Sequence, residues 1–163
     1  MPQRQAIDMR VRPPAPGFET LGLYWDKPRI IGMTRDVGFE PPPSYVADSL
    51  PQCLAEMAAA GVTLGVVTGR LAGRRMGCVS NTAIAELVSC HPDRFIGYGG
   101  IDVADVTEAR TEIRRILEDE RFKGIVVESG CADDPKYADD PSLAPISSTR
   151  SRAAAGRAAT PAR

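Results

Sequence analysis

The chain has 163 residues, which suits one domain with one sizeable core and is short for a (β/α)8 barrel of roughly 200 residues or more. With 20 basic and 21 acidic side chains, a formal net charge of −1 and a pI of about 5.9, its composition gives no global case for nucleic-acid or membrane binding. It contains no signal peptide and no long apolar run, so we expect a cytoplasmic protein. Four cysteines without C-x-x-C spacing favour reduced structural thiols over a zinc site: Cys53, Cys78, Cys90 and Cys131.

The first predicted element is a strand at residues 6–12. Apolar and charged residues alternate along it: Ile7, Asp8, Met9, Arg10, Val11 and Arg12. A period of two places the charged side chains on one face and the apolar ones on the other. Pro13 and Pro14 end the strand because proline cannot donate to a strand ladder. Residues 16–45 show little regular pattern and predict a long loop with one helical turn.

Residues 61–128 predict the centre of the fold as strand, helix, strand, helix, strand. Short runs rich in β-branched or aromatic residues predict strands at 62–67, 95–101 and 123–128. Apolar residues at helical spacing predict helices at 49–60, 80–90 and 105–120, with N-caps at Ser49, Ser80 and Asp105. This order implies parallel strands with right-handed crossovers, so function is expected at the carboxyl ends of the strands.

The loop at residues 68–79 combines glycines with Arg70, Arg74 and Arg75. Such a loop after a parallel strand can hold an anion, although it matches no known phosphate-binding pattern, and a solvated mobile loop is the favoured interpretation. The only histidine, His91, is expected to cap a helix on the side opposite the active face, not to act in catalysis. With one histidine in that place, a Ser-His or Cys-His triad is excluded.

The composition changes at Ser147. Residues 147–163 contain only Ser, Thr, Arg, Ala, Gly and Pro, with four arginines and no acid. No side chain larger than alanine is apolar there, so we expect a disordered tail after a domain at residues 1–146. The abrupt change is typical of a GC-rich gene read out of frame, and a frameshift is our hypothesis for it.

Several phrases of the sequence resemble one known family. They are EM at 56–57 before AGV at 60–62, NTAIA at 81–85, HPDRFIG at 91–97, FKGI at 122–125 and DDPSLAPI at 139–146. Together they resemble the amino-terminal half of the amidohydrolase-related family (the amidohydrolase 2 group) of metal-dependent hydrolases, which includes decarboxylases of aromatic and related carboxylic acids. The resemblance implies an α/β fold, an incomplete TIM-like (β/α)8 barrel of about four parallel β/α units.

The resemblance also implies a divalent metal such as zinc at the carboxyl ends of the strands. In the family the first strand usually ends in His-x-His, and the matching positions here are Arg10 and Arg12. Arginine is permanently charged and cannot bind a cation, so the usual metal is not expected here. Asp8 and Glu128 are weak metal candidates. We expect Arg10, Arg12 and Arg70 to bind an anion through their guanidinium groups; the alternative is that Arg10 and Arg12 simply pair with Asp8 and Glu128.

Three functional hypotheses follow. The first is an amidohydrolase-related hydrolase or decarboxylase for a small carboxylate-bearing substrate, of which this chain is a truncated part, inactive alone. The second is a non-catalytic module that binds a small anionic molecule through Arg10 and Arg12. The third is an inert fragment. In each case the open edges of a half barrel make self-association possible.

Overall fold

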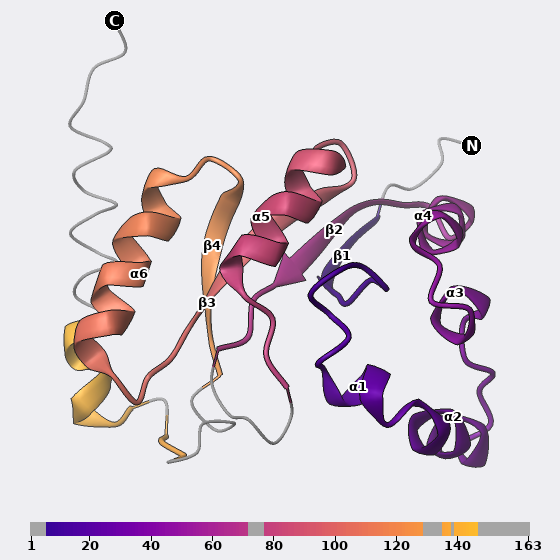
Figure 1. Cartoon of the computed structure of the whole chain (residues 1–163), viewed down its shortest axis with the longest axis horizontal. Coiled ribbons are helices and arrows are strands. Elements are labelled where there is room, and N and C mark those ends of the chain that lie inside the picture. The colour runs from indigo at the N-terminus through magenta and orange to yellow at the C-terminus, as the bar shows by residue number, and fades with distance from the viewer. Residues whose placement is uncertain (1–5, 72–76, 129–134, 138, 147–163) are drawn as a thin grey trace, which may run out of the picture.

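The computed structural model describes residues 6–71, 77–128, 135–137 and 139–146. Four strands form one sheet in the order β1-β2-β3-β4, and every neighbouring pair is parallel. The strands are β1 (Ala6–Val11), β2 (Val62–Thr68), β3 (Phe95–Ile101) and β4 (Phe122–Val127). The helices are α1 (Gly22–Trp25), α2 (Lys27–Asp36), α3 (Pro43–Val46), α4 (Leu50–Ala59), α5 (Asn81–Cys90) and α6 (Val106–Glu118) (Figure 1). The predicted fold class, about four parallel β/α units, is confirmed.

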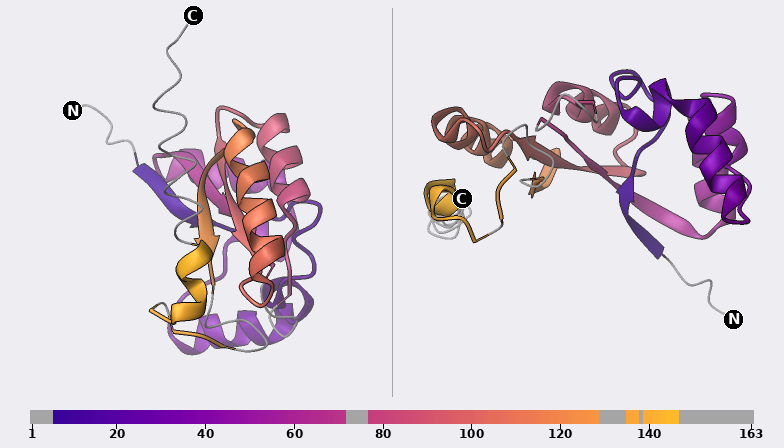
Figure 2. Two further views of the ribbon diagram at one scale, coloured as in Figure 1. Left: turned by 90° about the vertical axis from the view of Figure 1, so that its left-hand side faces the viewer. Right: turned by 90° about the horizontal axis from the view of Figure 1, so that it is seen from below.

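Helices α5 and α6 lie side by side on one face of the sheet, as the two views of Figure 2 show. Two glycines of β3 allow this close packing. A Cβ at Gly97 would come 2.9 Å from Cγ2 of Ile84 in α5, and one at Gly99 would come 2.4 Å from Cδ1 of Ile116 in α6. The helix stripe predicted for α6 is confirmed, because Ala109, Ile113 and Ile116 are buried.

The helix starts agree with the predicted N-caps. The backbone N–H of the third helical residue donates to Ser49, Ser80 and Asp105, at 3.3, 3.1 and 2.9 Å. Gln52 does not complete a capping box with Ser49, because the backbone N–H of Ser49 donates to the carbonyl of Ser44 instead of to the Gln52 side chain. His91 follows α5 and caps it through its backbone N–H, which donates to the carbonyls of Leu87 and Val88.

The prediction of a long loop at residues 16–45 is wrong, because this segment contains α1, α2 and the start of α3. Helix α2 has no buried residue, so it does not pack an apolar stripe on the core, which is the pattern on which helix prediction depends. Its boundary signals were nevertheless present: Pro28 lies in its first turn, and Gly38 follows its end with φ of +85°.

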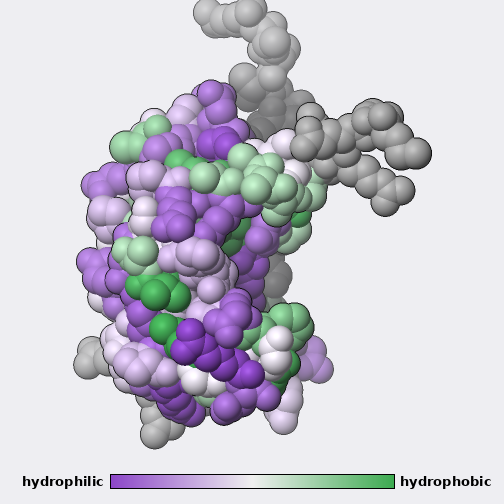
Figure 3. All heavy atoms as spheres, turned by 90° about the vertical axis from the view of Figure 1, so that its right-hand side faces the viewer, coloured by the Kyte–Doolittle hydropathy of each residue, from purple (hydrophilic) through white to green (hydrophobic). Residues whose placement is uncertain are grey.

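The side formed by α2, α3 and α4 is mainly hydrophilic, with separate hydrophobic patches (Figure 3). No helix among the described residues is both long and apolar enough to cross a membrane. Several sequence predictions lie outside the described residues, namely those for Arg74, Arg75, Cys131 and the tail at 147–163.

Candidate anion-binding site

Three arginines converge on one glutamate at the carboxyl ends of the strands. Arg10 lies near the end of β1 and Arg12 just beyond it, Arg70 follows β2, and Glu128 follows β4. The guanidinium of Arg10 contacts Oε1 of Glu128, and Nη2 of Arg12 lies 3.4 Å from the same oxygen. Nε of Arg70 lies 2.9 Å from Oε2, as an ion pair and not as a well-aligned hydrogen bond. We call these four residues the arginine cluster.

Most of the arginine cluster is withdrawn from solvent. The side chains of Arg12, Arg70 and Glu128 are 13%, 7% and 11% exposed, whereas Arg10 is 62% exposed. Three guanidinium groups carry many more N–H donors than one carboxylate can accept, and the four side chains sum to a formal charge of +2. Arg12 and Arg70 make further interactions as well. The cluster therefore concentrates positive charge where the local dielectric is low.

The structure brings together all three arginines that were predicted to bind an anion. Part of the alternative interpretation is also present, since Arg10 and Arg12 both pair with Glu128. Asp8 does not pair with a guanidinium there; its Oδ1 accepts the backbone N–H of Arg10 at 2.9 Å. Pairing with Glu128 and anion binding are compatible at Arg10, because its guanidinium contacts Glu128 and is still 62% exposed.

The backbone of Arg70 is held on both sides. Arg70 and Val79 exchange two backbone hydrogen bonds of 2.9 and 2.8 Å, and the N–H of Gly69 donates to Tyr98 at 2.8 Å. Gly69 packs directly on Gly100 of β3, where an added Cβ would come 2.7 Å from the carbonyl carbon of Gly69. The chain after β2 is thus fixed against the end of β3, and this contact sets the position of Arg70.

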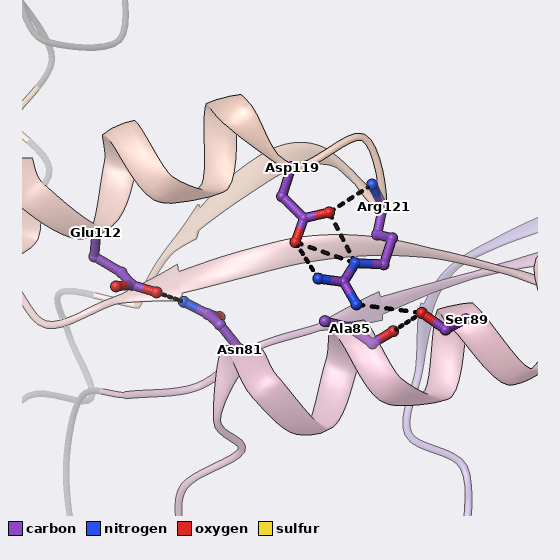
Figure 4. Close-up of polar contacts among 6 residues, drawn as sticks. All are labelled: Asn81, Ala85, Ser89, Glu112, Asp119 and Arg121. Carbon is purple, nitrogen blue, oxygen red and sulfur yellow. Dashed lines mark hydrogen bonds and ion pairs between the residues drawn. The ribbon is translucent and has the colours of Figure 1, made fainter.

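Asn81, the first residue of α5, secures the end of β3. Its side-chain amide donates to the carbonyl of Gly100 at 2.9 Å, and its Oδ1 accepts the N–H of Gly100 at 2.8 Å. The same amide donates to Glu112 of α6 at 2.7 Å (Figure 4). In the sequence, Asn81 stood out only as part of the NTAIA phrase at 81–85. The available signal was a polar amide at the first position of the predicted helix, directly after its N-cap.

Arg12 is positioned by the segment that follows β1. The hydroxyl of Tyr24 in α1 donates to the backbone carbonyl of Arg12 at 2.7 Å, and the hydroxyl of Tyr45 in α3 donates to the carbonyl of Leu23. Burial raises the pKa of Tyr24 far above its ordinary value, so this phenol remains a donor. Helices α1 and α3 are therefore tied to the strand end that carries Arg12.

Thr68 is a further polar residue that sequence reasoning missed. It ends β2 and is 5% exposed, and within the described part of the chain its hydroxyl is buried without a hydrogen-bond partner. Thr68 stands two residues before Arg70 in the chain.

The described residues do not fit the metal that the family resemblance implies. Glu128, one of the two weak metal candidates, has both oxygens engaged by guanidinium groups, and Asp8 is exposed. Among residues 6–71, 77–128, 135–137 and 139–146, no three His, Cys, Asp or Glu side chains gather as a metal site would require. The ring of His91 packs edge-on against Phe95, the first residue of β3, at the end of the sheet opposite the cluster.

Comparison with known proteins agrees with this fold. No protein-family model and no curated protein matches the chain. Among solved structures, an uncharacterized TIM-barrel protein of Bordetella bronchiseptica is 36% identical over 88% of this chain and 50% of its own, with a TM-score of 0.81. The 5-carboxyvanillate decarboxylase of Novosphingobium aromaticivorans, with bound manganese, is 22% identical over 93% of this chain and 48% of its own, with a TM-score of 0.59.

A 2,6-dihydroxybenzoate decarboxylase complexed with 2,6-dihydroxybenzoate is 19% identical over 94% of this chain and 48% of its own, with a TM-score of 0.54. The chain thus spans about half the length of the solved proteins that it matches. These neighbours confirm the TIM-barrel fold that the family resemblance implies. In fold, the chain is about half of a TIM barrel.

Proposed function

We propose that the chain supplies the carboxylate-binding part of an amidohydrolase-related protein that acts, as a hydrolase or a decarboxylase, on a small carboxylate-bearing substrate. The observation that carries the proposal is the arginine cluster at the carboxyl ends of the strands, where barrels of this kind bind their ligands. Two of the neighbours that share the fold are decarboxylases of 5-carboxyvanillate and 2,6-dihydroxybenzoate, which are both aromatic carboxylates.

The residues of the cluster have different parts in this proposal. Arg10 is the exposed guanidinium and makes the first contact with an arriving carboxylate. Arg12 and Arg70 are nearly buried. Tyr24 and Val79 fix their backbones and Glu128 pairs with their side chains, so they hold the anion in one orientation with little loss of side-chain entropy. Glu128 keeps the three guanidinium groups together when no ligand is bound.

A second candidate is a non-catalytic anion-binding module. It is favoured by Arg10 and Arg12 at the positions where the family pattern has histidines. Two measurements on the purified protein separate the two candidates. One is the turnover of aromatic carboxylates, monitored as the release of carbon dioxide, and the other is the metal content. Turnover supports the enzyme, whereas anion binding without turnover or metal supports the module.

Anion-dependent thermal stability tests the binding that both candidates share. Because a ligand that binds only the folded state raises stability, benzoate at one hundred times its dissociation constant should add about 2.7 kcal/mol to the free energy of unfolding. Sodium chloride at equal ionic strength serves as the reference. We expect Arg10→Ala to remove the shift and Arg114→Ala, which removes an exposed arginine of α6, to keep it. The absence of a shift with any anion would overturn the proposal.

A further inference from the structure

A pocket of about 390 Å³ adjoins the arginine cluster. It lies between Arg70 and the segment of α1 and α2, and we call it the α1–α2 pocket. Its apolar lining residues are Leu21, Leu23, Trp25, Ile30 and Met33, and its charged ones are Arg70, Asp26 and Arg29. Asp26 pairs with Arg29 at 3.5 Å, so the carboxylate of Asp26 is balanced by a neighbouring guanidinium. Trp25 and Met33 are 62% and 53% exposed, while Arg70 is 7% exposed. The pocket therefore has an open apolar side and a cationic inner end.

Residues 77–79 link Arg70, at one end of the α1–α2 pocket, to the segment that precedes α1, at the other. Gly77 has φ of +80°, and a Cβ there would come 1.9 Å from the carbonyl oxygen of Thr20, so this close approach requires glycine. The hydroxyl of Thr20 donates to the carbonyl of Cys78, and Val79 holds the backbone of Arg70. The position of Arg70 relative to α1 is thus built into the fold.

The lining defines the chemistry of a fitting ligand. Small inorganic anions satisfy the guanidinium groups but leave Trp25, Ile30 and Met33 in contact with water. A compact apolar body attached to a carboxylate satisfies both ends, because it removes apolar surface from water while the carboxylate meets Arg70. The volume of the pocket lies within the usual range for small-molecule sites.

We propose that the α1–α2 pocket holds the apolar body of a small organic carboxylate, whose carboxylate group meets the arginine cluster through Arg70. This inference rests on the proposed function and adds the residues that select the ligand. Trp25, Ile30 and Met33 then act as specificity-determining residues: they favour a carboxylate with a ring-sized apolar body over one with a methyl group.

Trp25 is the only tryptophan of the chain, so its fluorescence reports directly on the pocket. The full chain is titrated with cyclohexanecarboxylate and, separately, with acetate, and thermal unfolding is measured in the same samples. We expect both anions to raise the melting temperature. Only cyclohexanecarboxylate should change the emission of Trp25, and it should bind at least about tenfold more tightly than acetate, because its ring buries several more methylene groups.

A matched pair of variants locates the effect. Met33→Gln should weaken binding of cyclohexanecarboxylate roughly fivefold and leave acetate binding unchanged. Val37→Gln changes an exposed apolar residue just after α2 that does not line the pocket, and it should affect neither anion. If both anions raise the melting temperature and bind with equal affinity, the α1–α2 pocket does not hold the apolar body of the ligand, and the proposed function still stands. No rise with either anion would overturn both.

Discussion

At the scale of residues, the site depends on a few polar side chains that bridge distant parts of the chain. Glu128 contacts Arg10 and Arg12, which precede it by 118 and 116 residues. Asn81 bonds both backbone groups of Gly100, which fixes the strand end next to Arg70. Since each bridge ties one element to another, its loss affects the arrangement of the site as well as stability.

Asn81→Ala tests this role. The substitution leaves the N–H and the carbonyl of Gly100 without their side-chain partner, and each unsatisfied group costs about 1–3 kcal/mol. We expect the free energy of unfolding to fall by about 2–4 kcal/mol in urea denaturation. Thr82→Ala, at the exposed neighbouring position, should change it by less than about 0.5 kcal/mol. Similar losses for the two variants would contradict the bridging role.

At the scale of elements, polar contacts on the outer side join α5, α6 and the turn before β4. Arg121 bonds the carboxylate of Asp119 through Nε and Nη2, at 2.8 and 2.6 Å, and Nη1 bonds Ser89 of α5 at 3.2 Å (Figure 4). These hydrogen bonds hold the pKa of Asp119 below its ordinary value. The contact fixes how the chain leaves α6 and enters β4.

Asp119→Asn tests this contact through its pH dependence. Because the pKa of Asp119 is lower in the folded state, its contribution is present above the unfolded pKa of about 4 and is lost as the pH falls through the folded pKa. We expect the variant to lose less than about 1 kcal/mol at neutral pH, since the pair is partly exposed, and to match the parent at strongly acid pH.

Urea denaturation at a series of pH values measures this difference. Asp93→Asn, at an exposed position in the turn before β3, serves as the control and should show no such trend. A loss that stays constant from neutral to acid pH would show that the carboxylate charge of Asp119 is not involved.

At the scale of the whole molecule, four parallel strands form an open sheet. Within the described residues, β1 and β4 each have one neighbouring strand. Ile7 and Met9 of β1 are 56% and 58% exposed, and Val127 of β4 is 46% exposed. Closed barrels have no strand edges, whereas open edges with exposed apolar side chains favour association.

We therefore expect this chain on its own to associate as its concentration rises, which sedimentation velocity measures. Met9→Lys should reduce association, because a charged side chain at a strand edge opposes pairing. Val37→Lys, which adds the same charge at an exposed position after α2, should have little effect. A chain that remains monomeric at every concentration would rule out association through the strand edges.

The sequence by itself determined the strands, the helices after residue 49, their caps and the parallel order, because these depend on local spacing and on the chain order of β/α units. It also pointed to Arg10, Arg12 and Arg70, and it named Glu128 as an alternative partner. Only the tertiary structure decided that all four meet, that Asn81 secures Gly100, and that α1 and α2 form a pocket beside Arg70. Local patterns carry no information on contacts across more than a hundred residues; those follow from how the strands align in the sheet and where the loops between them pack.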